Sequence, residues 1–360
     1  MSAIYRNVNN WLSESGAWLR PGPVARIERT VADVENDAGS DLRAAMRGRR
    51  IGLALGSGSA RGLAHIGVIR ALQEAGVAVD LVAGTSIGAV IGAIYAAGQI
   101  ERAASDFLAF DWKSIAALLD PVFPRAGLID GGRVADFLRG YIGGRTFEEL
   151  PLPLRVVASD LQTGNEVVFA SGDLVDAVRA SIAVPGVLTP KRIGGQILVD
   201  GGLVNPVPVG TARAMGAEFV IAVDLNCDIV EGRLSRQRPG LPTGASARAR
   251  LLEALRARHS TLLAQFESWL QEEPLPGIFE VLLGSLSIMQ ARITEANLRS
   301  DAPDLLIRPA LGALRFLDFD RAAEIIEAGY VSAQEALARW PMNEGPPGPP
   351  LLREPAARTR

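Results

Sequence analysis

The sequence is poor in the residues that build disulfides and metal sites. It has one cysteine, Cys227, and two histidines, His65 and His259, among 360 residues. A single cysteine excludes an intrachain disulfide framework and a cysteine metal cluster, which fits a reducing cytoplasm. Two histidines far apart in the sequence are too few for a three-histidine metal site. We therefore expect no metal and no other cofactor.

Long apolar runs and an excess of positive charge are also missing. Hydrophobic residues make up 48% of the chain, yet no unbroken apolar run reaches the length of about 18 residues typical of a membrane span. The N-terminus lacks a basic-then-apolar signal pattern with a cleavage site, so we expect a cytoplasmic protein. The formal net charge of −3 offers no basic surface for nucleic acid, which we exclude as a partner.

Composition and periodicity divide the chain into four expected segments. An amphipathic stretch containing Trp11 and Trp18 is followed by a proline-containing linker, and strands then alternate with helices. A stretch rich in Arg, Pro, Gly and Ser precedes further helical patterns, and the tail is dense in proline and glycine. The predicted segments are an N-terminal helix and linker (1–50), an α/β domain (51–227), a helical C-terminal extension (228–340) and a disordered tail (341–360).

The chain is organised around Gly84-Thr85-Ser86-Ile87-Gly88. An apolar run at 77–83 predicts a buried strand before this motif, and a small-residue helical pattern follows it. Strand, tight turn and helix are the context in which Gly-x-Ser-x-Gly forms a nucleophile elbow. Gly84 and Gly88 lack the side chains that would crowd such a turn. The alternative is a chance match in a loop rich in small residues.

A second small-residue loop lies between the strand predicted at 51–56 and the helix predicted at 63–75. It fails the dinucleotide fingerprint because Arg61 stands at the sixth position counted from Gly56, and no P-loop lysine follows. Beside a serine elbow, its backbone amides could instead face an oxyanion. The alternative is that the glycines only allow close packing. On the following helix we expect His65 to be packed and hydrogen-bonded.

A serine nucleophile needs a base, and the sequence offers two arrangements. Asp200 follows the strand predicted at 196–199 and precedes Gly201-Gly202, so it could accept the Ser86 proton directly. A dry pocket would raise the basicity of its carboxylate. Ser86, Asp200 and His259 also follow the chain order of the α/β-hydrolase triad, although His259 lies in a helical pattern. A third reading makes Asp200 a turn residue that caps its own backbone.

Four stretches stand in one order along the chain: Leu55-Gly56-Ser57-Gly58-Ser59-Ala60-Arg61-Gly62, Gly84-Thr85-Ser86-Ile87-Gly88, Ala177-Val178-Arg179-Ala180-Ser181 with Pro185-Gly186, and Asp200-Gly201-Gly202 with Asn205. In this order and spacing they resemble the patatin-like phospholipase family, specifically bacterial members related to the neuropathy-target-esterase (NTE) branch. The resemblance covers about residues 51–224. The glycine-rich loop differs in one respect, since the family often has glycine where Ser57 and Ser59 stand.

The resemblance implies a three-layer α/β fold with a mostly parallel central sheet, and a role for each motif. Ser86 would be the nucleophile and Asp200 the base of a Ser–Asp dyad. The backbone amides around Ser57, Gly58 and Ser59 would form the oxyanion hole. The supporting residues would be Gly56, Arg61, Gly62, Gly84, Gly88, Gly201 and Gly202.

The expected function is hydrolysis of fatty-acyl esters of phospholipids or lysophospholipids through an acyl-enzyme. Two alternatives stay open: a Ser-Asp-His carboxylesterase, and a regulatory scaffold of the same fold with little activity. The expected partner is a lipid ester. The N-terminal stretch either packs on this chain or a second subunit, or contacts the inner face of a membrane. Oligomerisation is left open.

Overall fold

The computed structural model describes residues 45–118, 120, 127–227, 278–312, 314 and 316–340, all within one compact unit, Ala38–Arg360. Several predictions concern other parts of the chain. The N-terminal helix, the helical stretch that carries His259 and the proline-rich tail lie outside the described residues.

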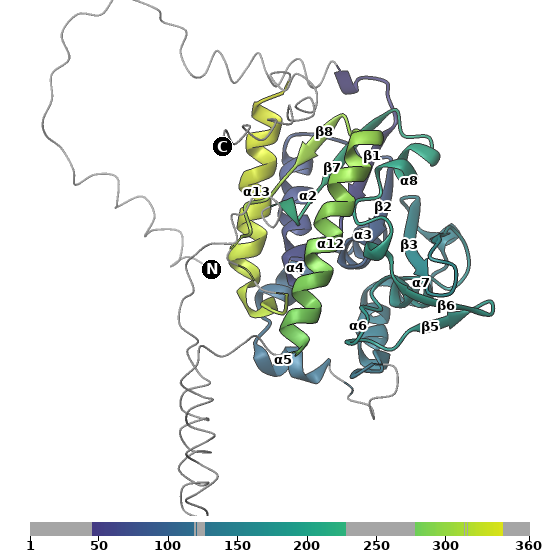
Figure 1. Cartoon of the computed structure of the whole chain (residues 1–360). Helices are drawn as coiled ribbons and strands as arrows, with labels where there is room; N and C mark the ends of the chain where they lie inside the picture. Colours follow the sequence, from purple (N-terminus) through teal and green to yellow (C-terminus); the bar gives the residue numbers. More distant parts are fainter. Residues whose placement is uncertain are drawn as a thin grey trace, which may run out of the picture. The chain divides into compact units, whose positions relative to one another are not determined.

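The described strands form one eight-stranded sheet in the order β5-β6-β3-β2-β1-β7-β8, with β4 paired to β3 outside this path (Figure 1). Strands β3, β2, β1, β7 and β8 run parallel, whereas β4, β5 and β6 are antiparallel to their neighbours. The predicted, mostly parallel sheet is confirmed. The strands are β1 (Ile51–Leu55), β2 (Leu81–Thr85), β3 (Leu154–Asp160), β4 (Glu166–Phe169), β5 (Lys191–Ile193), β6 (Gln196–Asp200), β7 (Phe219–Val223) and β8 (Leu305–Ile307).

Helices cover both faces of this sheet. The α-helices are α2 (Ala64–Glu74), α3 (Ile87–Ala96), α4 (Ile100–Leu108), α5 (Trp112–Ala117), α6 (Gly132–Ile142), α7 (Leu174–Ser181), α8 (Val209–Ala214), α12 (Ile278–Ser300) and α13 (Ala322–Ala338). The short 3-10 helices are η1 (Ser59–Leu63), η2 (Phe147–Glu149), η3 (Gly201–Leu203) and η4 (Phe319–Arg321). Within the described segments, no helix combines the length and apolar character needed to cross a bilayer.

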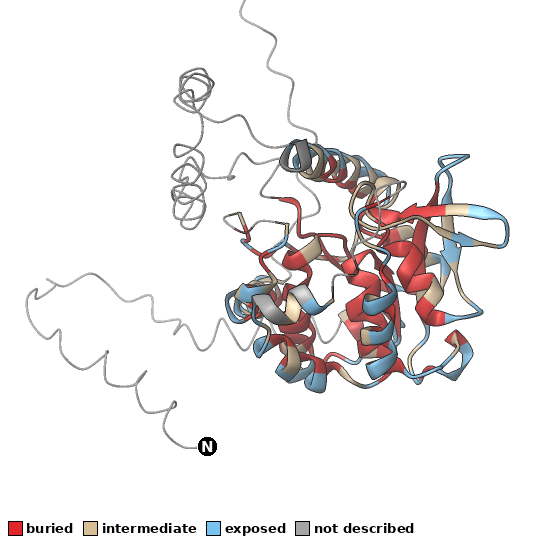
Figure 2. Cartoon of the chain, turned by 90° about the horizontal axis from the view of Figure 1, so that it is seen from below, coloured by how far each residue is buried: buried red, intermediate tan, exposed pale blue. Residues whose placement is uncertain are grey.

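Alternating side chains of the central strands build two cores. Leu53 and Leu55 of β1 join one apolar cluster with α2, α3 and α13. Ala54, between them in sequence, joins a second cluster with α8 and with Leu298 of α12. Successive side chains of a strand point to opposite faces, so both faces of the sheet need cover. The result is the predicted three-layer arrangement, with its buried residues concentrated in the sheet and the helix faces against it (Figure 2).

The described residues after 278 take part in the same sheet and core. Strand β8 pairs in parallel with β7, and α13 packs closely on α2. A Cβ atom on Gly67 would lie 1.9 Å from the Ile326 carbonyl oxygen, and one on Gly329 would lie 2.0 Å from that of Ala64. Glycine at both positions therefore allows the two helix backbones to touch.

Strand β2 begins later than the sequence predicts. It spans Leu81–Thr85 instead of 77–83. Asp80 marks the start, because its backbone N–H donates to the Ile51 carbonyl at 2.8 Å and its Oδ2 accepts from the Ile51 N–H at 2.6 Å. The apolar residues before Asp80 belong to the connection from α2. The shift brings Thr85, the residue before Ser86, into the strand.

Candidate active site

Ser86 stands at the turn between β2 and α3, where the sequence predicts a strand–turn–helix. Its φ of 57° and ψ of −124° are strained for a residue with a side chain. A Cβ atom on Gly84 would lie 2.5 Å from the Gly88 carbonyl oxygen, and one on Gly88 would lie 2.1 Å from that of Leu55. The two motif glycines thus leave room for a sharp turn that holds Ser86 at the helix start.

Asp200 meets Ser86 through strand β3, which lies between β2 and β6. Thr85 is in register with Val157 of β3, and Asp200 is in register with the next residue, Ala158. Two residues 114 positions apart in sequence therefore come together at the ends of the two strands that flank β3. The Ser86 hydroxyl donates a hydrogen bond of 2.5 Å to Oδ2 of Asp200.

The Asp200 carboxylate is buried, with 1% of the residue exposed. Its second oxygen, Oδ1, accepts from the Gly202 backbone N–H at 2.7 Å. Burial raises the pKa of Asp200 from 3.8 to about 6, against the opposing effects of the Ser86 and Gly202 hydrogen bonds. One oxygen thus caps the following turn, and the other faces the serine with increased basicity.

The backbone N–H of Ser86 is held by Ser181 of α7. It donates to the Ser181 hydroxyl at 2.8 Å, and that hydroxyl donates to the Val157 carbonyl at 2.6 Å. Ser181 is fully buried. The side chain therefore ties the elbow to strand β3, and the Ser86 amide is already engaged. Sequence reasoning noted Ser181 only as part of a motif, because nothing local indicates that its hydroxyl reaches Ser86.

The glycine-rich loop lies directly against this elbow. A Cβ atom on Gly62 would come within 2.2 Å of the Ile87 side chain, and one on Gly88 within 2.8 Å of the Gly56 carbonyl oxygen. Ile87 and Gly88 are the two residues after Ser86. The loop thus packs against the N-terminal end of α3, the helix that begins directly after Ser86.

The backbone amides of the loop differ in whether they have a hydrogen-bond partner among the described residues. The Ser57 N–H donates to the Pro206 carbonyl at 2.8 Å, and the Ala60 N–H donates to the Phe316 carbonyl at 3.1 Å. Between them, the N–H groups of Gly58 and Ser59 have no hydrogen-bond partner among the described residues. Ser59 has a φ of 52°, the left-handed region that glycine adopts at lower cost. Of the three amides that the sequence predicts for an oxyanion hole, that of Ser57 is therefore already engaged, and those of Gly58 and Ser59 stay candidates.

Buried polar side chains form hydrogen bonds with the glycine-rich loop. The Ser57 hydroxyl donates to Oε1 of Gln290 on α12 at 3.2 Å, and the Asn226 side-chain amide donates to the Ser57 carbonyl at 3.2 Å. Arg61 donates to Oδ1 of Asn226 at 2.9 Å. The sequence indicated Arg61 as a supporting residue but gave no sign of Asn226 or Gln290. Asn226 follows β7 and Gln290 lies on α12, and neither stands in a recognisable motif.

His65 is the histidine that the structure describes. His65 is fully buried, and its Nε2–H donates to the Gly56 carbonyl at 2.8 Å. Burial lowers the pKa of His65 from 6.5 to about 4, so the ring is neutral near pH 7. This is the packed, hydrogen-bonded histidine that the sequence predicts. His259, the candidate for a catalytic triad, lies outside the described residues.

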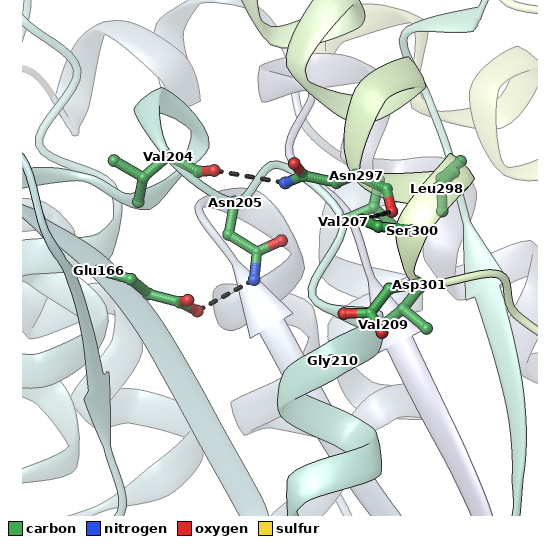
Figure 3. Close-up of a pocket in the computed structure, with 10 residues that line it drawn as sticks. All are labelled: Glu166, Val204, Asn205, Val207, Val209, Gly210, Asn297, Leu298, Ser300 and Asp301. Carbon is green, nitrogen blue, oxygen red and sulfur yellow. Dashed lines mark hydrogen bonds between the residues drawn. The ribbon is translucent and has the colours of Figure 1, made fainter.

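A polar hollow of about 290 Å³ lies near the loop that follows η3 (Figure 3). The backbone oxygen of Asn205 accepts from the Thr85 hydroxyl at 2.8 Å, which connects this loop to the elbow. The Asn205 side chain donates to Glu166 at 2.9 Å. Neither Ser86 nor Asp200 lines the hollow. In the part of the chain that the structure describes, no cluster of three or more His, Cys, Asp or Glu side chains could hold a metal ion.

Comparison with known proteins agrees with this fold. A model of the patatin-like phospholipase family matches residues 53–213, the stretch from β1 into α8. An uncharacterized NTE family protein of Mycobacterium tuberculosis is 34% identical over 335 residues, which cover 82% of this chain and 93% of that protein. The chain belongs to the patatin-like phospholipase family. Its similarity to NTE family proteins confirms the branch that the motifs indicate.

Two further comparisons extend over most of the chain. Human patatin-like phospholipase domain-containing protein 6 is 32% identical over 311 residues, which cover 84% of this chain and 21% of that protein. Among solved structures, VipD from Legionella pneumophila aligns with a TM-score of 0.38 and 13% identity over 80% of this chain and 66% of that one. Membership of the family implies a lipid hydrolase activity.

Proposed function

We propose that this protein hydrolyses fatty-acyl esters of phospholipids or lysophospholipids, with Ser86 as nucleophile and Asp200 as base. The observation that carries the proposal is the 2.5 Å hydrogen bond from the Ser86 hydroxyl to the buried Asp200 carboxylate, at a strained strand–helix turn. Family membership supports the lipid substrate class. Phospholipids and lysophospholipids are the members of that class that the resemblance to the family implies.

The first half-reaction forms an acyl-enzyme. Asp200 takes the hydroxyl proton as Ser86 Oγ attacks the ester carbonyl, and the carbonyl oxygen becomes an oxyanion. The free amides of Gly58 and Ser59 donate to this oxyanion, where preorganised donors in a site shielded from water are most effective. When the tetrahedral intermediate collapses, the C–O bond to the leaving alcohol breaks, and the alcohol takes the proton from Asp200.

The second half-reaction returns the free enzyme. Asp200, again ionised, takes a proton from a water molecule that attacks the acyl carbonyl on Ser86. The second tetrahedral intermediate uses the same two amides and collapses to release the fatty acid, while Ser86 recovers its proton. A dyad has no imidazole to act as base, so the raised pKa of Asp200 is what makes the carboxylate an adequate one.

The test compares the wild type with Ser86→Ala in a hydrolysis screen over phospholipids and lysophospholipids. Ser300→Ala is the matched control, because its exposed hydroxyl donates only to a backbone carbonyl on its own helix. We expect fatty-acid release from the wild type and the control, and none above background from Ser86→Ala. The substrate assignment fails when no lipid distinguishes the wild type from Ser86→Ala.

A fluorophosphonate probe tests the nucleophile separately from the substrate. We expect one covalent adduct on the wild type, located by mass spectrometry on the peptide that contains Ser86. A catalytically weak scaffold would leave Ser86 unmodified. His259→Ala separates the two hydrolase mechanisms: the dyad keeps turnover within a few-fold of wild type, whereas a Ser-Asp-His triad loses most of it.

A further inference from the structure

The carbonyl groups at the start of the glycine-rich loop are held by buried side chains. Three consecutive carbonyls, at positions 56 to 58, each accept a hydrogen bond from a different residue. The donors are His65 Nε2 to the Gly56 oxygen at 2.8 Å, Asn226 Nδ2 to the Ser57 oxygen at 3.2 Å and Arg61 Nε to the Gly58 oxygen at 3.4 Å.

These contacts also orient the amides of the loop. In a planar trans peptide, the carbonyl of one residue and the N–H of the next point in opposite directions. Holding the Ser57 carbonyl therefore aims the Gly58 N–H the other way, and holding the Gly58 carbonyl does the same for Ser59. Gly58 and Ser59 are the two loop amides without a partner among the described residues.

Asn226 joins both parts of this arrangement. Its Nδ2 donates to the Ser57 carbonyl, and its Oδ1 accepts from Arg61 Nη2 at 2.9 Å, which places the Arg61 guanidinium where Nε reaches Gly58. The Asn226 side chain is itself fixed, because its own backbone N–H donates to Oδ1 of Asp224 at 2.9 Å and the residue is fully buried. A short, buried amide with both ends engaged has little freedom to move.

We propose that Asn226 is a positioning residue that orients the Gly58 and Ser59 amides toward the oxyanion, through the Ser57 carbonyl and Arg61. The inference rests on the proposed hydrolase function, which gives these amides their ligand. Among the described residues, Asn226 forms no hydrogen bond with Ser86 or Asp200, and its effect is exerted through the loop backbone.

The test uses Asn226→Asp and Asn226→Ala. The aspartate keeps the size of the side chain and the acceptor for Arg61 but loses the donor to the Ser57 carbonyl, whereas alanine loses both. Asn297→Asp is the matched control, since its Nδ2 also donates to a backbone carbonyl, that of Val204 at 3.4 Å, away from the loop. Each variant is measured for kcat and KM on a soluble acyl ester and for inhibition by a trifluoromethyl ketone, whose serine adduct carries an oxyanion.

We expect kcat of Asn226→Asp to fall by about 10- to 100-fold, because removing an oxyanion donor outright costs about 100- to 1000-fold. KM should change by less than about threefold, because the two amides bind the oxyanion of the transition state more strongly than the carbonyl oxygen of the bound ester. Trifluoromethyl ketone inhibition should weaken in parallel with kcat. Asn226→Ala should lose at least as much, and Asn297→Asp should stay within about twofold of wild type in both kinetic constants.

A crystal structure of Asn226→Asp gives a readout that needs no activity. We expect the Ser57–Gly58 peptide to turn, so that its carbonyl no longer faces position 226. An unmoved peptide, a kcat within twofold of wild type, or a kcat loss without weaker ketone inhibition would each overturn the inference. If the wild type and Ser86→Ala release the same products from every ester, the proposed function fails, and the peptide orientation alone still decides the role of Asn226.

Discussion

Two buried aspartates occupy comparable places in the sheet and have different surroundings. Asp200 ends β6, and Asp224 directly follows β7. They are 1% and 2% exposed, and burial raises the pKa of both carboxyls above 3.8. In each, one carboxylate oxygen accepts from the backbone N–H two residues later, Gly202 or Asn226.

The two aspartates differ in the partner of their second carboxylate oxygen. That of Asp200 accepts from the neutral Ser86 hydroxyl, whereas that of Asp224 faces the Arg308 guanidinium, with Nε 3.4 Å away. Arg308 and Arg61 both act to lower the pKa of Asp224 against the effect of burial. A carboxylate beside a hydroxyl can accept its proton, while one beside two cations is suited to hold its neighbours in place. We therefore expect the neighbouring charge, more than the position on the strand, to decide whether such an aspartate acts as a base or holds its neighbours in place.

The largest test of this comparison replaces each aspartate by asparagine. We expect Asp200→Asn to lower kcat on a soluble acyl ester by about 1000- to 10,000-fold, because an amide cannot take the Ser86 proton. Asp224→Asn should lower kcat by less than about tenfold, since its Oδ1 can still accept from the Asn226 N–H. Steady-state kinetics with the concentration of folded enzyme checked by circular dichroism would measure both.

Equal losses in the two variants would break the comparison. Asp200→Asn with more than a tenth of wild-type kcat would also contradict the assignment of Asp200 as base, and would direct attention to His259.

The pH profile gives the next largest effect. Because Asp200 must be ionised to accept a proton and its pKa is about 6, we expect kcat/KM to be level above pH 7 and to fall about tenfold per pH unit well below 6. Asp224→Asn should retain the same profile. An acid limb near pH 4 in the wild type would mean that the carboxylate titrates as though exposed to water, against its burial.

Protein stability should respond in the opposite direction to activity. A pKa raised from 3.8 to about 6 means that ionised Asp200 costs the folded state roughly 3 kcal/mol, a cost absent below pH 4 and fully present above pH 6. Asp200→Asn removes this cost, and its Oδ1 can still accept from Gly202. We expect a gain of roughly 2 kcal/mol in the free energy of unfolding at pH 8, shrinking toward zero at pH 4.

Urea denaturation of wild type and Asp200→Asn at both pH values measures this gain. If the variant is less stable than wild type at pH 8, the hydrogen bonds from Ser86 and Gly202 to the ionised Asp200 carboxylate outweigh the cost of burying its charge.

The parts of this site that could be predicted from sequence are those written into short segments. The elbow at Ser86 combines an apolar strand, a small-residue turn and a helix within about 20 residues, and each signal is local. Asp200 could be identified as a candidate from the sequence because Gly201 and Gly202 follow it. Asp224 also follows an apolar strand, but no pair of glycines comes after it, and the sequence predicted no role for it.

The rest depends on which distant segments become neighbours. Asn226 and Gln290 reach the loop only because β7 lies beside β1 and α12 packs near η3. Which loop amides are free likewise depends on Pro206 and Phe316, whose carbonyls bind the amides on either side. The start of β2 was misplaced for a similar reason, since the bonds between Asp80 and Ile51 of β1 set it.

The smallest effect concerns the cation beside Asp224. The Arg308 side chain is 42% exposed, so water and salt screen its attraction to the carboxylate. We expect Arg308→Gln to lower the free energy of unfolding by less than about 1 kcal/mol at pH 8. Since Arg308 lowers the pKa of Asp224, its contribution is present while that carboxylate is ionised and should fade as the pH falls and Asp224 takes up a proton.

Arg292→Gln is the matched control for this prediction. Arg292 pairs with Glu295 at 3.0 Å on the surface of α12, where both side chains are more exposed than Asp224. We expect this control to change stability by less than Arg308→Gln does, because neither of its charges is buried. Chemical denaturation at pH 8 and pH 4 in both variants provides the measurement. If Arg308→Gln has no greater effect than the control, then Asp224 is held by Asn226 and Arg61 rather than by Arg308, and the contrast with Asp200 rests on those two residues.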